Sequence, residues 1–238
     1  MRQRKELAKF ANIPGVTNSF VRYQSKLTQQ HTPNPTATAD WIVNRSNLGY
    51  LPLDIQIPWE IIREEALAVV PEMIAYPSTD YDSHGWFNFG IYTRGADDLG
   101  DHGREVVEHN DSWTEQARTL MPRTVEYFAT QWPHKQFHKI RLLALYPRGV
   151  IGLHSDDCDG LHNINIAIDH PEQCDFVLEH SGVIPFENGR AFLVNVGRRH
   201  AVVNNSDQLR IHLVIYQDND DAFGNLVLQS YNNYTQDS

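Results

Sequence analysis

The spacing of apolar residues predicts two helices in the first half of the chain. After Pro58, apolar residues recur every three or four positions until Pro71, as they do along one face of a helix. Proline is favoured in the first turn of a helix and disrupts its interior, so these prolines are expected to mark the two ends. A second stripe of this kind follows Pro122. The stripe positions are Trp59, Ile62, Ala66 and Val69 in the first helix and Val125, Phe128, Ala129 and Trp132 in the second.

Between these helices the pattern changes to that of a strand and loops. Residues Gly85–Thr93 alternate aromatic side chains with polar or small ones, which is typical of a strand with two different faces. Residues Gly95–His109 are charged and contain glycine, and residues 28–40 are polar with Pro33 and Pro35. Neither segment has a hydrophobic period, so both are predicted to be loops.

From Ile140 onward, short apolar runs alternate with turn residues, at a spacing typical of an all-β sandwich or barrel. We therefore predict a mainly β protein with flanking helices, built around a double-stranded β-helix, the jelly-roll barrel of cupin-like proteins. Residues 1–45 are expected to form an N-terminal arm and loop, and residues 46–238 a single barrel domain with its N-terminal helices. The predicted strands are Ile140–Tyr146, Ile164–Ile168, Phe176–Glu179, Ala191–Val194, Ala201–Val203 and Arg210–Tyr216.

Composition and charge narrow the class of protein. With 238 residues, of which 41% are hydrophobic, the chain can bury one sizeable core. No run reaches the roughly 18 apolar residues that a membrane span requires. A net charge of −10 makes a nucleic-acid partner unexpected, although residues 1–26 carry six basic side chains against one acidic one. This basic arm either contacts a polyanion or lies on the acidic body of the protein.

The cysteine content and the first residues indicate the cellular setting. Cys158 and Cys174 are too few for a disulfide framework and lack the close paired spacing of a zinc site. The N-terminal residues have no apolar core of the kind found in signal peptides. We therefore expect reduced thiols and a cytoplasmic protein.

The pattern His-x-Asp occurs twice, in His109-Asn110-Asp111 and in His154-Ser155-Asp156. Two neutral imidazoles and one carboxylate on one face of a ferrous ion leave its opposite face open for a cosubstrate and dioxygen. The first pair lies in a polar loop with no strand leading into it. The second pair follows a predicted strand and a predicted turn at residues 147–149, and this context favours it.

A third ligand must come from a distant histidine, and the arginine that follows each candidate helps to choose it. A buried arginine can hold the distal carboxylate of 2-oxoglutarate through two parallel charge-assisted hydrogen bonds. Both His180 and His200 have an arginine ten residues later. His180 lies in a turn-like segment and Arg190 only introduces a strand, whereas Arg210 opens the strand RIHLVIY. We therefore predict Arg210 as the cosubstrate clamp. The predicted metal ligands are His154, Asp156 and His200.

Two segments carry a resemblance to a known family. They are RLLALYPRGVIGLHSD, in which Pro147 stands seven residues before His154, and GRAFLVNVGRRHAVVNNSDQLRIHLVIY. Together they resemble the aspartyl/asparaginyl β-hydroxylase family of Fe(II)- and 2-oxoglutarate-dependent oxygenases, which includes proline cis-hydroxylase-like members. The resemblance covers about a third of the chain and implies iron binding by residues 154, 156 and 200, with Arg210 on the distal carboxylate of 2-oxoglutarate.

The same resemblance shows where this chain departs from the family pattern. Animal aspartyl hydroxylases have glycine where Asp156 stands, so this chain looks like the three-ligand bacterial type. Where those enzymes place a histidine on the cosubstrate and an arginine on the substrate, this chain has Asn165 and Asn163. The resemblance thus implies a cosubstrate contact for Asn165 and substrate contacts for Asn163 and Asn88. It also weakens any inference that the substrate is an acidic side chain.

Together these features predict a 2-oxoglutarate-dependent dioxygenase that hydroxylates a carbon of an amino acid, free or within a peptide or protein. Succinate and carbon dioxide would be the coproducts. Fe(II) is the expected metal, with 2-oxoglutarate and dioxygen as cosubstrates and ascorbate as a stimulant. The alternative is a cupin-like metal-binding or interaction protein without turnover, which has no need for an arginine clamp. The sequence predicts neither the particular substrate nor the oligomeric state.

Overall fold

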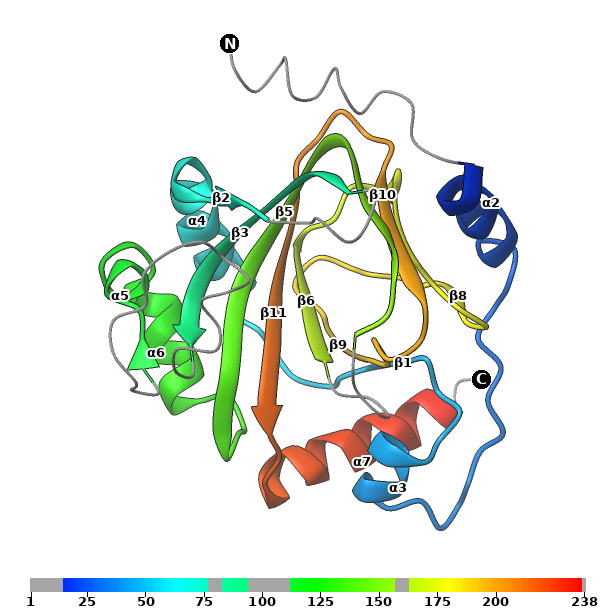
Figure 1. Ribbon diagram of the computed structural model, residues 1–238. Coiled ribbons are helices and arrows are strands. Elements are labelled where there is room, and N and C mark those ends of the chain that lie inside the picture. The colour runs from blue at the N-terminus through cyan, green and yellow to red at the C-terminus, as the bar shows by residue number, and fades with distance from the viewer. Residues whose placement is uncertain (1–14, 77–82, 94–111, 157–162, 237–238) are drawn as a thin grey trace.

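The protein is a curled half-barrel of antiparallel strands with helices on its outside (Figure 1). The computed structural model describes residues 15–76, 83–93, 112–156 and 163–236. Along the sheet the strand order is β1-β9-β6-β11-β5-β10-β7-β8, and β3 also pairs with β5. The strands are β1 (Tyr50–Pro52), β2 (Ile74–Ala75), β3 (His84–Thr93), β4 (Ser112–Trp113), β5 (Gln136–His154), β6 (Asn163–Asp169), β7 (Cys174–Leu178), β8 (Gly182–Val183), β9 (Ala191–Val194), β10 (His200–Asn204) and β11 (Arg210–Asp218).

This arrangement confirms the predicted jelly-roll class, but one predicted turn is wrong. Residues 147–149 do not end a strand: β5 continues through them to His154, pairing first with β11 and then with β10. Arg148 takes a left-handed backbone conformation with φ 63°, which bends the strand at this point. Because of the bend, the first part of β5 pairs with β11 and the last part with β10. The end of the strand places His154 in the barrel interior.

Side chains alternate between the two faces of the large sheet and so pack into two separate hydrophobic cores. On β11, Ile211, Leu213 and Ile215 face the helices and join the larger core cluster. Inside the barrel a second cluster gathers around Phe176, Phe192 and other apolar residues. Polar residues on the other face of these strands, such as Asn165 of β6 and Arg210 of β11, therefore belong to the barrel interior.

The two predicted helices are present and cover the outer face of the sheet. The first is α4 (Trp59–Val69), followed by the 3-10 helix η2 (Val70–Glu72) around Pro71. The second is α6 (Pro122–Thr130), preceded by α5 (Glu115–Leu120). The predicted loop Gly95–His109 lies outside the described residues. None of the helices in the described part of the chain is long and apolar enough to cross a bilayer.

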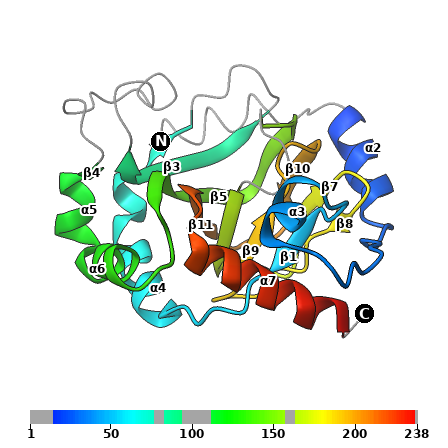
Figure 2. The same cartoon turned by 90° about the horizontal axis from the view of Figure 1, so that it is seen from below.

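Four of the described helices, α5 among them, were not predicted from the sequence. α2 (Gly15–Gln24) and α3 (Ala39–Asn44) lie in the segment expected to be an arm and loop, and α7 (Asp221–Gln236) follows the last strand. α3 lies beside α7, below the barrel in Figure 1 and in front of it in Figure 2. Short helices have little stability of their own in water and depend on tertiary packing, so their sequence pattern is weak. α3 also has a local cap, because Thr38 accepts a hydrogen bond from the backbone of Trp41.

Candidate metal centre and cavity

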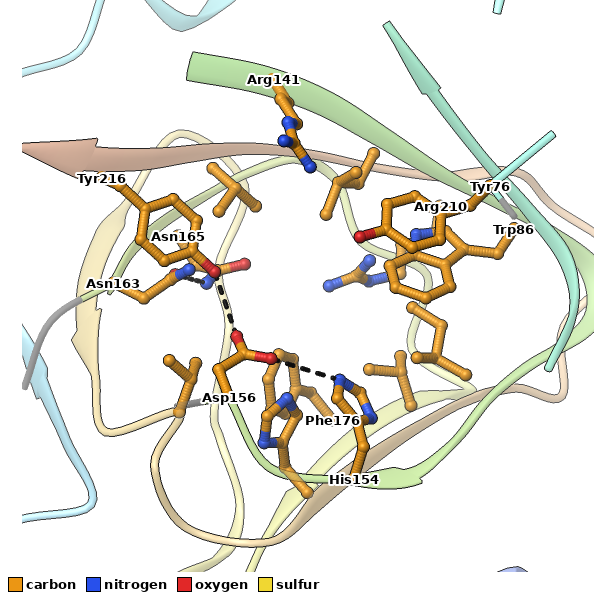
Figure 3. Close-up of a pocket in the computed structure, with 16 residues that line it drawn as sticks. Tyr76, Trp86, Arg141, His154, Asp156, Asn163, Asn165, Phe176, Arg210 and Tyr216 are labelled. Atoms are coloured by element: carbon orange, nitrogen blue, oxygen red, sulfur yellow. Dashed lines mark hydrogen bonds and ion pairs between the residues drawn. The ribbon is translucent and has the colours of Figure 1, made fainter. Parts of the chain in front are cut away.

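A cavity inside the barrel gathers side chains from β3, β5, β6, β10 and β11 (Figure 3). Its empty space is about 630 Å³, a volume that includes the solvent at its open mouth. Apolar side chains form much of the wall. The polar lining residues considered below are Arg141, His154, Asp156, Asn163, Asn165, His200, Arg210 and Tyr216.

Strand pairing brings the two predicted histidine ligands together from distant parts of the sequence. His154 ends β5 and His200 begins β10, and the two residues are direct partners in the antiparallel ladder. Their ring centroids are 4.2 Å apart. Phe176 on β7 stacks on the His200 ring at 5.3 Å between centroids, which holds the plane of that imidazole. The barrel architecture itself therefore creates the histidine pair.

Backbone carbonyl groups set the tautomers of both histidines. Nδ1 of His154 lies 2.7 Å from the Gly152 carbonyl oxygen, and Nδ1 of His200 lies 2.9 Å from the Arg198 carbonyl oxygen. A carbonyl only accepts, so each Nδ1 carries the proton and each Nε2 presents a lone pair. Burial and the neighbouring His154 lower the pKa of His200 to about 4, which keeps this ring neutral at physiological pH. This is the protonation state that a metal ligand needs.

Asp156 completes the group two residues after His154. Its Oδ1 lies 3.8 Å from Nε2 of His154, and its Oδ2 accepts a hydrogen bond of 3.0 Å from the Tyr216 hydroxyl. The backbone N–H of Asp156 donates to the Val196 carbonyl at 2.9 Å, which fixes the position of the residue beyond the end of β5. One carboxylate oxygen is thus engaged by protein while the other faces the histidines.

These three residues fit a divalent metal ion. Their ligand atoms all lie within 4.8 Å of one another, so one ion could contact all three. Two imidazole nitrogens and one carboxylate oxygen form the donor set of non-haem iron sites that keep open positions for ligands. Hydrogen bonds behind the ligands orient their donor atoms, as is usual around protein-bound metals.

Arg210 extends into the same cavity from the first position of β11 (Figure 3). It is 2% exposed, and within the described residues its Nε has no hydrogen-bond partner. Burial lowers the pKa of Arg210 to about 10, so the guanidinium stays charged at neutral pH. A buried cation without a matching acceptor is costly, and a bound carboxylate would satisfy its donors. The orphaned donor therefore fits the anionic end of a ligand such as 2-oxoglutarate.

The other predicted site residues divide into two groups. Asn163 and Asn165 are buried on β6 and line the cavity. Asn88 is buried on β3, but its side chain lies 3.5 Å from the Ile74 carbonyl oxygen and is not among the residues lining the cavity. The rival residues His180 and Arg190 are also outside this lining, and the rival pair His109-Asn110-Asp111 lies outside the described residues.

Sequence reasoning missed two polar side chains of this cavity, Arg141 and Tyr216. Both could have been found from strand alternation. Tyr216 lies six residues after Arg210 on the same strand and hence on the same face. Arg141 is the one charged residue in the run Ile140–Tyr146 and is 7% exposed. The apolar wall includes Trp86, whose indole ring stacks on Tyr76 at 3.7 Å between centroids.

The jelly-roll barrel, the histidine and carboxylate group and the arginine beside it define a class, that of Fe(II)- and 2-oxoglutarate-dependent oxygenases. A family model, described as aspartyl/asparaginyl β-hydroxylase, matches residues 56–218. The match covers more than half of the chain and includes the cavity residues from β5 to β11. The chain belongs to the aspartyl/asparaginyl β-hydroxylase family, and it is a 2-oxoglutarate-dependent hydroxylase that uses Fe(II).

Solved structures show more distant similarity. A 2OG-Fe(II) oxygenase family oxidoreductase from Burkholderia pseudomallei is 16% identical, with a TM-score of 0.46 over 80% of this chain and 94% of that one. A viral collagen prolyl hydroxylase from Paramecium Bursaria Chlorella virus-1 is 12% identical, with a TM-score of 0.42 over 71% and 96%. A Pseudomonas putida prolyl-4-hydroxylase is 10% identical, with a TM-score of 0.41 over 76% and 96%. A comparison with curated proteins gave no match. The family assignment rests on the family model.

Proposed function

We propose that this protein hydroxylates a carbon atom of an amino acid, free or within a peptide or protein. In the proposed site, iron is held by His154, Asp156 and His200, and Arg210 binds the distal carboxylate of 2-oxoglutarate. The observation that carries the proposal is the group of three ligand atoms within 4.8 Å of one another, in one cavity with a buried guanidinium. A non-catalytic metal-binding barrel would not require that guanidinium.

The residues of the cavity would orient the two substrates. When bound, the ferrous centre supplies the oxidising chemistry: one atom of dioxygen enters the new hydroxyl group, the other enters succinate, and carbon dioxide is released. Arg210 would fix the far end of 2-oxoglutarate, and the neutral imidazoles would hold the metal without adding charge. The apolar wall around Trp86 and Phe176 would exclude water from the reacting atoms.

The side-chain amides of two asparagines on β6 would bind oxygen atoms of the two substrates. Asn165 is the proposed cosubstrate contact and Asn163 the proposed substrate contact, since both line the cavity. Asn88 remains a weaker substrate candidate, since its side chain lies near the backbone of β2. The guanidinium of Arg141 lies in the same cavity, so the wall offers mainly hydrogen-bond donors. Such a wall supports a substrate that carries carboxylate or carbonyl oxygens.

A cytoplasmic setting is part of the same proposal. Cys174 is a buried free thiol, and its burial raises the pKa to about 11, so it is protected from deprotonation. Cys158 lies outside the described residues. A protein with a persistent buried thiol is compatible with a reducing compartment.

A turnover assay tests the proposed function. The purified protein would be incubated with Fe(II), ascorbate, 2-oxoglutarate and panels of free amino acids and peptides, and succinate and hydroxylated product would be quantified. We expect succinate in proportion to product, and incorporation of oxygen from labelled dioxygen into the new hydroxyl group. The His154→Ala variant serves as the inactive control. Succinate formation no higher than that of this control across both panels would contradict the proposal.

A further inference from the structure

A chain of buried polar side chains leads away from the candidate metal site through the wall of the barrel. Nδ1 of His170 lies 2.9 Å from Nε2 of His212, and Nδ1 of His212 lies 3.4 Å from Oδ1 of Asn165. Asn165 Nδ2 in turn donates to Asn163 Oδ1. His212 is 0% exposed, Asn163 2% and Asn165 3%, so solvent does not compete for these groups.

The inner end of this chain is the carboxylate of Asp156. Asn163 forms a side-chain hydrogen bond with the Tyr216 hydroxyl, and that hydroxyl donates to Asp156 Oδ2 at 3.0 Å. In Figure 3 Tyr216 lies above Asp156, beside the two asparagines. We call the whole set the donor chain. Its members are His170, His212, Asn165, Asn163, Tyr216 and Asp156.

The direction of every hydrogen bond in the donor chain follows from its charged end. An ionised carboxylate can only accept, so Tyr216 must give it its single hydroxyl proton. The Tyr216 oxygen is then an acceptor for the Asn163 amide, and Asn163 Oδ1 accepts from Asn165. The remaining acceptor, Asn165 Oδ1, faces His212, whose Nδ1 must carry the proton.

Reversal of any member would place two donors or two acceptors against each other. Such a mismatch in a buried place leaves hydrogen-bonding groups unsatisfied, which is unfavourable. Burial and the neighbouring Arg210 lower the pKa of His212 well below its usual value, which keeps the ring neutral with one proton. From His212 inward, the donor chain is therefore locked in one direction, with each member donating toward Asp156.

We propose that Tyr216 is a positioning residue that keeps Asp156 a one-oxygen metal ligand, and that the donor chain holds the Tyr216 hydroxyl in place for this hydrogen bond. The inference rests on the proposed metal site. Oδ2 is held by Tyr216 while Oδ1 lies 3.8 Å from the His154 nitrogen. Without the Tyr216 hydroxyl, Oδ2 loses this hydrogen bond, and the carboxylate can turn toward the metal with both oxygens. That would occupy a position that 2-oxoglutarate needs.

The test compares Tyr216→Phe with the matched control Tyr146→Phe. Tyr146 is also half-buried on a barrel strand, but it packs on Phe87 and does not line the cavity. Apoprotein would be titrated with Mn(II) by calorimetry, and the Mn(II)-loaded protein would then be titrated with 2-oxoglutarate. In Tyr216→Phe we expect Mn(II) binding to persist and 2-oxoglutarate binding to weaken about 10- to 100-fold. The control should behave as the wild-type protein does.

A spectroscopic readout separates positioning from a general structural role. The visible spectrum of bound Co(II) responds to the number and geometry of its ligands, so Tyr216→Phe should change it and Tyr146→Phe should not. The Asn163→Leu variant keeps the bond between Tyr216 and Asp156 but removes the group that orients it. It should therefore weaken 2-oxoglutarate binding less than Tyr216→Phe does, and it provides a second measurement if the tyrosine variant does not fold.

The outcomes distinguish this inference from the proposed function. Wild-type protein that binds Mn(II), with loss of binding in His154→Ala, supports the metal site. An unchanged Co(II) spectrum and unchanged 2-oxoglutarate affinity in Tyr216→Phe would then overturn the positioning role alone. Asn163→Leu indistinguishable from the wild-type protein would overturn the role of the donor chain. Wild-type protein that binds no Mn(II) would overturn both proposals together.

Discussion

Arg210 shows how a single residue can be unfavourable for folding and useful for ligand binding. Its guanidinium is buried in the barrel, and within the described chain its Nε has no hydrogen-bond partner. Burial of a charge without an opposite charge or hydrogen-bond acceptor opposes folding. A buried arginine of this kind is therefore expected mainly where a bound ligand supplies the acceptor. The pKa of Arg210, lowered to about 10 by burial, is the electrostatic sign of this cost.

Replacement of Arg210 should separate stability from cosubstrate binding. Arg210→Met keeps an extended apolar side chain and removes the charge. We expect 2-oxoglutarate affinity to fall by about 10- to 100-fold, since hydrogen bonds to charged groups contribute about 1.5–3 kcal/mol. The thermal unfolding midpoint of the apoprotein should rise, because a buried unpaired cation is removed. Calorimetric titration and thermal scans measure the two effects.

Arg190→Met is the matched control for this prediction. Arg190 stands ten residues after His180, as Arg210 does after His200, but it is partly exposed and pairs with Glu187 at 3.6 Å. This control should leave 2-oxoglutarate binding unchanged. Equal cosubstrate affinity in Arg210→Met and wild-type protein would remove Arg210 from its proposed role.

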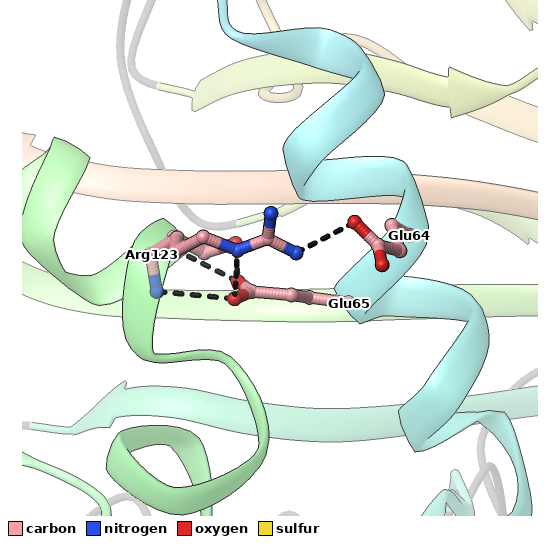
Figure 4. Close-up of polar contacts among 4 residues, drawn as sticks. Glu64, Glu65 and Arg123 are labelled. Atoms are coloured by element: carbon pink, nitrogen blue, oxygen red, sulfur yellow. Dashed lines mark hydrogen bonds and ion pairs between the residues drawn. The ribbon is translucent and has the colours of Figure 1, made fainter.

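At the scale of elements, a buried carboxylate joins two of the helices that cover the sheet (Figure 4). Glu65 of α4 is 6% exposed and accepts hydrogen bonds at the start of α6. They come from the backbone and hydroxyl of Thr124, at 2.9 and 2.7 Å, and from the backbone and Nε of Arg123, both at 3.1 Å. Met121, the N-cap residue of α6, supplies no side-chain hydrogen bond. Glu65, which belongs to α4, caps α6 instead, because its carboxylate accepts from backbone N–H groups in the first turn of α6.

Glu65→Gln should therefore destabilise the protein, whereas Glu64→Gln should not. The amide of glutamine removes the charge and turns one acceptor into a donor that faces other donors. We expect a loss of about 1–3 kcal/mol in the free energy of unfolding, measured by denaturant titration. Glu64 pairs with the same arginine but its side chain is 72% exposed, and an exposed pair contributes little. Equal stability of the two variants would contradict the capping role.

Elements with a strong local pattern were predictable, and those without one were not. The strand Ala191–Val194 has the predicted bounds because its residues are apolar and turn residues flank it. The bend in β5 was missed because proline and glycine at residues 147–149 are typical of turns, and only the pairing of Val150 with β10 shows that the strand continues. α7 was missed because its helical stripe is diluted by polar residues and its stability depends on packing against α3 and β1.

For the whole molecule, the candidate metal site links ligand binding to folding. β10 pairs with β5, and this pairing brings His154 beside His200. A metal that binds only the folded state therefore stabilises this part of the sheet. Because Asp156 also bonds to Tyr216 of β11, the site connects both layers of the barrel.

We expect Mn(II) together with 2-oxoglutarate to raise the thermal unfolding midpoint. At ligand concentrations of about 100 times the Kd the gain is about 2.7 kcal/mol, which corresponds to roughly 5–10 °C for a domain of this size. The rise should vanish in His200→Ala and persist in His180→Ala, since only the first histidine belongs to the ligand group. A thermal shift that is equal in these two variants would place the metal elsewhere.

The sequence by itself determined the class of fold, and it led to the prediction of two histidines and one carboxylate as metal ligands, with His200 and Arg210 preferred to their rivals. These inferences depend on local periodicity and on residue types at short spacing, which the chain carries directly. Only the tertiary structure decided which atoms face one another: the Nδ1 of each histidine against a backbone carbonyl, the Nε of Arg210 without a hydrogen-bond partner among the described residues, and the hydroxyl of Tyr216 on Asp156. Such contacts arise where strands distant in sequence pair and place their side chains on the same inner face. A local sequence pattern does not predict which strands will pair.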